Sequence, residues 1–422
     1  MDKPMQEKKD PHMTKAPKHK WTFAARFRYH AFGWRSQPAI ERVKEAVSEI
    51  KAAARQDMIL GAEGAILLLE KLSPALEQVD SSSGAIGSAV NNAIETLVPI
   101  IAQAPSDETT RSSWLDRLWK AVEEDAIPYI EILPEYWGVL CRTQEMASHW
   151  GDELIIPLRH SWSQDRRAGG GYFKGTSACL SALCAAGRYP EVFSLLDLAP
   201  YKFWSYRQWG VKALIAMGKQ AEALRYAEES RGINEPVAAI AAACEQILLD
   251  SGMADEAYRR YAITANQKTT YLATFRAIAK KYPQKTSRDI LADLVAKSPG
   301  NEGKWFAAAK SAGLYSEAIE LANRTPCDPK TLIRAARDMK SREPRFAVEA
   351  GVTALRWLAA GYGYEITGFD VREAYQFTME AARNAGCEGN ARERIRAVVA
   401  SDPPPIRMVS TILSSELGML VK

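Results

Sequence analysis

The sequence has few of the residues that build metal or redox centres. Among its 422 residues there are only five histidines and six cysteines. Three of the histidines lie within the first 30 residues, and the cysteines are scattered through apolar, helix-like stretches. Metal sites need clustered ligands, whereas Cys179 and Cys184 lie five positions apart, on different faces of a helix. We therefore expect no metal site, and buried, reduced thiols in a cytosolic protein.

Long hydrophobic runs are also missing. The longest apolar stretches, such as residues 65–69, are far shorter than the roughly 20 residues that a membrane-spanning helix needs. The lysines near the N-terminus are not followed by the apolar run of about 7 to 15 residues that a secretory signal requires. The sequence thus predicts a cytoplasmic protein without a membrane span.

Local catalytic motifs are absent as well. No nucleophile elbow, zinc-protease helix or dinucleotide fingerprint occurs. Residues 171–176 read Gly-Tyr-Phe-Lys-Gly-Thr, which superficially suggests phosphate binding, but Lys174 precedes the glycine and no strand is expected before it. We expect no nucleotide, no other cofactor and no enzymatic activity, although an active site assembled from distant residues would leave no such motif.

Positive charge is concentrated at the N-terminus. Residues 1–35 hold nine basic and three acidic residues, a net charge of +6, so that the remaining chain carries −2 of the total of +4. Residues 1 to about 20 lack apolar periodicity and are predicted to form a disordered tail. Any attraction for polyanions should therefore reside in this segment.

Aromatic residues follow the basic tail, between Trp21 and Trp34. Rings interleaved with cations are typical of surfaces that bind single-stranded nucleic acid. The other interpretation is that the rings pack this segment onto the first helix while the cations stay solvated. The candidate nucleic-acid-binding cations are Lys18, Lys20, Arg26, Arg28 and Arg35.

One short phrase, Gly-x-x-x-Glu followed by a small apolar residue, recurs four times. The copies are Gly187-Arg188-Tyr189-Pro190-Glu191-Val192, Gly218-Lys219-Gln220-Ala221-Glu222-Ala223, Gly252-Met253-Ala254-Asp255-Glu256-Ala257 and Gly313-Leu314-Tyr315-Ser316-Glu317-Ala318. Each copy lies between two apolar helical runs, where glycine ends one helix and glutamate occupies the first turn of the next. The intervals of 31, 34 and 61 residues predict a stacked helical repeat with one blurred copy in the last interval.

This phrase resembles the turn between the two helices of the tetratricopeptide repeat. Five residues before the turn glycine that family has a small residue, as at Ala182, Ala213 and Ala308, although Ile247 departs from the pattern. Five residues after it the family has alanine, matched here by Ala223, Ala257 and Ala318, with Val192 close. The family's early tryptophan, first-helix glycine and closing proline are not in register, so these repeats are divergent. The likeness covers about 150 of the 422 residues.

More loosely, the body of the chain looks like the helical regions that accompany zinc-binding SWIM modules in some bacterial proteins. The Cys-x-Cys and Cys-x-His ligands of that module are absent, so the likeness implies architecture and no activity. We predict an all-α protein, a right-handed α-solenoid of antiparallel helix pairs.

Helical periodicity and turn residues extend this prediction to the rest of the chain. Expected helices outside the repeats cover residues 40–54, 61–79, 85–103, 108–124, 143–160, 330–339, 344–360 and 406–420, with one more capped by Asp370. The predicted division is a basic tail with an aromatic segment at 1–35, a helical block at 36–165, the repeat array at 172–340, and C-terminal helices with a cap at 341–422.

An aromatic cluster within the array is the candidate partner-binding site, because interfaces favour Trp, Tyr and Arg. Its residues are Tyr201, Trp204, Tyr206, Arg207 and Trp209. The tryptophans could equally fill the space between adjacent helix pairs. The sequence favours a protein-interaction scaffold that holds a protein or peptide in a helical groove, and the alternative is a nucleic-acid-associated protein. It does not predict the oligomeric state.

Overall fold

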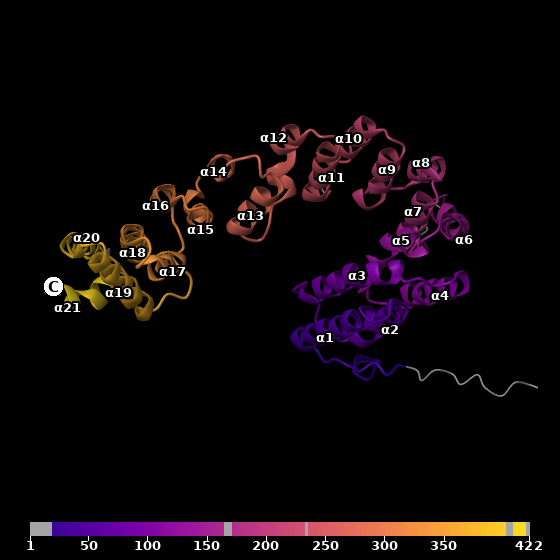
Figure 1. Ribbon diagram of the computed structural model, residues 1–422, viewed down its shortest axis with the longest axis horizontal. Helices are drawn as coiled ribbons and strands as arrows, with labels where there is room; N and C mark the ends of the chain where they lie inside the picture. Colours follow the sequence, from indigo (N-terminus) through magenta and orange to yellow (C-terminus); the bar gives the residue numbers. More distant parts are fainter. Residues whose placement is uncertain (1–18, 164–170, 233–234, 402–407, 419–422) are drawn as a thin grey trace, which may run out of the picture. The chain divides into compact units, whose positions relative to one another are not determined.

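The computed structural model describes residues 19–163, 171–232, 235–401 and 408–418 (Figure 1). Within these ranges every regular element is a helix, which confirms the predicted all-α class. Residues 1–18 of the tail expected at 1 to about 20 lie outside the described residues, as do residues 164–170 and 402–407. The chain divides into two compact units, residues 1–235 and 236–422. The four-part division stays a prediction.

The first unit begins with a short 3-10 helix and continues as a series of α-helices. Its elements are η1 (Phe23–Ala25), α1 (Ser36–Ala54), α2 (Met58–Leu76), α3 (Ala85–Gln103), α4 (Glu108–Glu124), η2 (Leu133–Tyr136), α5 (Trp137–Cys141), α6 (Gln144–Ser163), α7 (Thr176–Ala185), α8 (Tyr189–Leu198), α9 (Trp204–Ala216) and α10 (Gln220–Glu228).

The described part of the second unit is likewise built of helices. Its elements are α11 (Val237–Asp250), α12 (Ala254–Ala265), α13 (Tyr271–Lys281), α14 (Ser287–Ala296), η4 (Glu302–Trp305), α15 (Phe306–Ser311), α16 (Tyr315–Arg324), α17 (Pro329–Met339), α18 (Pro344–Ala359), α19 (Gly368–Asn384), α20 (Glu388–Ala400) and α21 (Met408–Leu417). Within each unit, several helices that are consecutive in sequence pack on one another, such as α9 on α10 and α11 on α12 (Figure 1).

The start expected from the sequence agrees with the structure at α4 and differs from it at α19. Helix α4 begins after Asp107, whose carboxylate accepts a hydrogen bond from the Thr110 amide at 2.7 Å. At α19 the expectation that Asp370 is the cap is wrong by three residues. Thr367 is the N-cap, and Asp370 completes a capping box by accepting a hydrogen bond from the Thr367 amide at 2.7 Å.

The four repeated glycines adopt one common conformation. Gly187, Gly218, Gly252 and Gly313 all have φ of +74°. After each glycine the next amide donates to a carbonyl five residues earlier, as from Lys219 to Leu214 at 2.9 Å. This is the Schellman pattern, which requires a left-handed residue and therefore favours glycine. The predicted role of the repeated glycine as a helix terminator is confirmed.

Two further turns have the same hydrogen bonding. Gly361 and Gly386 have φ of +78° and +67°, and the amide after each donates five residues back. The second is followed by Asn390 and Ala391 in place of the repeated Glu-Ala. In the long interval between the third and fourth copies, α13 and α14 occupy the place of the unit that lacks the repeated phrase. There Thr286 caps α14, and no turn glycine precedes the helix.

One helix of the described chain, α3, is long and apolar enough to cross a membrane by length and composition alone. It packs against α1 and α2, and the apolar side chains on one face of it are buried in the core of the first unit, whereas Ile100 is half-buried and Pro99 is exposed. These buried residues include Ile86, Val90, Ile94 and Leu97. Burial of this kind is compatible with the core helix of a soluble protein.

Candidate partner-binding surface

The predicted aromatic cluster lies on and just before α9, and its two tryptophans are buried. Trp204 is 8% exposed and Trp209 is 4% exposed. Arg207 is half-buried, with its Nε 2.5 Å from the Ser230 hydroxyl and its guanidinium 3.8 Å from the centroid of the Tyr226 ring. The burial of the two tryptophans agrees with the second interpretation, in which they fill the space between helices.

The exposed part of the cluster is a short ladder of rings. Tyr201 and Phe203 are 47% and 43% exposed, and their rings stack with centroids 5.0 Å apart. Phe203 in turn lies 5.8 Å from the half-buried Tyr206, which contacts Trp162 at 5.4 Å. Burial raises the pKa of the Tyr206 phenol. Phe203 was not in the predicted set, although it lies between two residues that were.

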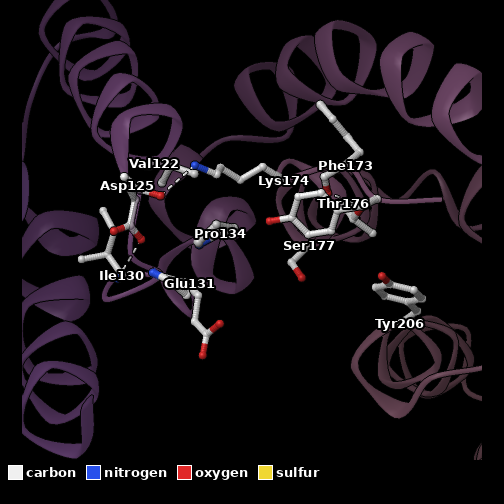
Figure 2. Close-up of a pocket in the computed structure, with 13 residues that line it drawn as sticks. Val122, Asp125, Ile130, Glu131, Pro134, Phe173, Lys174, Thr176, Ser177 and Tyr206 are labelled. Atoms are coloured by element: carbon white, nitrogen blue, oxygen red, sulfur yellow. Dashed lines mark hydrogen bonds between the residues drawn. The ribbon is translucent and has the colours of Figure 1, made fainter. Parts of the chain in front are cut away.

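Tyr206 also lines a cavity of about 330 Å³ within the first unit. Figure 2 shows Tyr206, carried by α9, across the cavity from Pro134 and Glu131. Tyr172, which is 76% exposed, and Pro128 complete the wall. The ladder of rings and this cavity together present aromatic and proline surfaces side by side, and we call them the aromatic surface.

Lys174, from the phosphate-like segment, has a structural role. Its Nζ donates to the Glu123 carbonyl at 3.0 Å, at the C-terminal end of α4. It also donates to the Asp125 carbonyl at 2.9 Å (Figure 2). The buried Asp125 carboxylate accepts from the amides of Tyr129 and Ile130 at 3.3 and 3.0 Å. The cation therefore compensates terminal helix carbonyls, as basic groups commonly do there.

The described residues contain no group of three or more His, Cys, Asp or Glu side chains arranged to hold a metal ion. Burial raises the pKa of four thiols to about 12, so they remain protonated at neutral pH. These are Cys141, Cys179, Cys184 and Cys327.

The N-terminal aromatic segment is divided between core and surface. Trp21, Phe23 and Phe27 are 7%, 3% and 1% exposed and belong to the core of the first unit. Tyr29 and Trp34 are 68% and 72% exposed. Only exposed rings could stack on bases without local unfolding. The nucleic-acid interpretation is therefore limited to Tyr29 and Trp34 among these rings.

The candidate cations of this segment differ in their contacts. Arg26 pairs with Glu45 at 2.8 Å, and the Nε of Arg28 donates to the Ala25 carbonyl at 2.9 Å. Lys20 and Arg35 are exposed. Lys18 lies outside the described residues.

Comparison with known proteins gave no match, either to a protein-family model or to a curated sequence. The likeness to tetratricopeptide repeats and to SWIM-associated regions stays a prediction.

Proposed function

We propose that this chain is a cytoplasmic, non-enzymatic interaction scaffold, a right-handed α-solenoid of antiparallel, tetratricopeptide-like helix pairs. The recurring turn supports the architecture. The residue five positions after each of the four repeated turn glycines, and after Gly386, is fully buried, as expected where helix pairs stack. These residues are Val192, Ala223, Ala257, Ala318 and Ala391.

The aromatic surface carries the proposal of a protein or peptide partner. Tyr201 and Phe203 expose nearly half of their area, although apolar rings gain free energy when they leave water. Aromatic side chains have few rotors, so their immobilisation on binding loses little entropy, and they dominate interface energetics. The adjoining cavity offers Tyr206 as a deeper contact for the same partner.

A photo-crosslinking amino acid at position 203 tests this proposal directly. We expect a discrete protein adduct in the native cell that persists after nuclease treatment. The matched control is the same group at position 364, because Tyr364 is 80% exposed in the second unit. Phe203→Ser should lose the adduct formed by a crosslinker at Tyr201, with unchanged helical content. Equal adducts at the control position, or none at position 203, would refute the proposal.

The nucleic-acid alternative now depends on Tyr29 and Trp34 with their neighbours Lys20, Arg28 and Arg35. Their exposure is the observation that favours it. Such binding should weaken steeply with salt, because phosphate contacts release counterions. Replacing Tyr29 and Trp34 with alanine should lower affinity for a single-stranded oligonucleotide, and an unchanged affinity would exclude this segment.

A further inference from the structure

A second cavity, of about 410 Å³, lies between α4 and α6 and has tryptophans for its floor. The rings of Trp119 and Trp150 meet with centroids 5.8 Å apart at 58°. Trp137 packs behind both, at 5.5 and 5.0 Å. Leu154, Pro157 and Phe173 complete the apolar lining of this groove, which belongs wholly to the first unit.

The rim of the groove is acidic. Asp116 and Glu123 from α4 and Glu153 from α6 line it, together with His149. All three carboxylates are exposed, and within the described chain none of them has an ion pair or a side-chain hydrogen bond. On the same helix, by contrast, Glu124 lies 3.7 Å from Lys120.

Aromatic faces under carboxylates form a site for a cation. The face of an indole ring attracts a guanidinium or ammonium group, most strongly when water is partly excluded. The three carboxylates repel an anionic ligand, whereas a cation relieves their mutual repulsion. The chemistry of floor and rim therefore selects a positively charged ligand.

The spacing of the carboxylates on the rim fits an extended peptide better than a single small cation. Asp116 and Glu123 are seven residues apart, which corresponds to about 10 Å along a helix. An extended peptide covers this distance in about three residues. A basic segment with cations three positions apart could therefore meet both carboxylates of α4 across the tryptophan floor.

We propose that the groove between α4 and α6 docks an extended, arginine- or lysine-rich peptide segment of a partner protein. Charge complementarity with the unpaired rim and the tryptophan floor is the basis of the proposal. The groove shares only Phe173 with the aromatic surface, so the two proposals can fail separately.

The test uses the full-length chain and a fluorescein-labelled ten-residue peptide in which arginine occurs at every third position between glycine and serine. Fluorescence polarisation should show binding that weakens with salt, and a peptide with glutamate in place of arginine should not bind. The variant D116N/E123Q/E153Q should lower the affinity about tenfold, as expected for three exposed ion pairs. Trp119→Leu should lower it about threefold through the lost ring face.

A matched control variant distinguishes binding at the groove from non-specific electrostatic attraction of the basic peptide to the chain. E95Q/D197N/E393Q removes the same number of negative charges at exposed positions outside the groove and should leave affinity within twofold. Equal losses in both triple variants would overturn the proposal. Binding seen only after deletion of residues 1–18 would also overturn it, since the chain's own basic tail would then be the occupant. Crosslinking at position 203 should not respond to the groove variants.

Discussion

Replacement of Glu245 with leucine should destabilise the second unit more than any surface change. Glu245, on α11, is completely buried. Its carboxylate accepts hydrogen bonds from the Tyr282 hydroxyl at 2.6 Å, the Lys281 ammonium at 2.6 Å and the Asn266 amide at 2.7 Å. One side chain thus connects three successive helices through charge-assisted bonds.

The expected loss of stability follows from the polar groups that leucine would leave without an acceptor. The Tyr282 hydroxyl would be buried without an acceptor, which costs about 1–3 kcal/mol. Removing one member of a buried ion pair costs about 3–5 kcal/mol. Lys281 is 31% exposed and can turn to water, and Asn266 keeps its bond to the Ala262 carbonyl, so we expect about 3–5 kcal/mol in total. That corresponds to a melting temperature lower by about 6–20 °C.

Thermal unfolding followed by circular dichroism, with hydrogen exchange to localise the effect to α11–α13, measures this loss. The control is Glu320→Leu, because Glu320 and its partner Arg324 are 60% and 53% exposed and should contribute no more than about 0.5 kcal/mol. The variant E245L/K281M/Y282F removes the unpaired polar groups as well and should be more stable than E245L alone. If E245L unfolds like the wild type, or the triple variant is no better, the network does not stabilise this unit.

Three further predictions concern other parts of the chain. Gly252→Ala should destabilise by about 1–2 kcal/mol, because φ is +74° there, whereas Gly389→Ala, in open space within α20, should be neutral or stabilising. Burial and the bond to Glu245 raise the pKa of Tyr282, so its stabilising effect should be present below pH 10 and be lost as the pH rises above about 10, where the unfolded phenol ionises. Tyr282→Phe should therefore flatten the fall in melting temperature above pH 10. Phe27→Ala should cost about 3–5 kcal/mol in a denaturant titration, whereas Trp34→Ala should change stability by less than about 0.5 kcal/mol.

The sequence predicted those features of the fold that depend on neighbours in the chain. A left-handed residue is needed wherever a helix ends in a Schellman turn, so the glycines at 187, 218, 252 and 313 could be recognised without knowledge of the tertiary structure. The turn at Gly386 was missed because Asn390 replaces the glutamate of the motif. Glutamate contributes only a modest interaction with the helix dipole, so the turn forms without it.

The candidate site was harder to predict, because burial depends on which helix face meets a neighbour. Helix α9 carries apolar or aromatic residues on all sides, so its sequence does not decide whether Trp204 and Trp209 are inside or outside. Packing places both in the core and leaves Tyr201 and Phe203 at the surface. The residue types of the cluster therefore did not decide which of its side chains face solvent.

The acidic groove illustrates the same limit of sequence-based prediction, here for charged side chains. Along α4, Lys120 could pair by spacing with either Asp116 or Glu124, and an ordinary interpretation gives both acids a solvated helix face. In the structure Lys120 lies 3.7 Å from Glu124, and among the described residues the Asp116 carboxylate has no ion pair. Its function then depends on Trp150, which is 34 positions away in sequence and reaches the groove through α6. A pattern within one helix cannot contain this information, because the site exists only where the surplus charge of α4 meets an aromatic floor supplied partly by another helix.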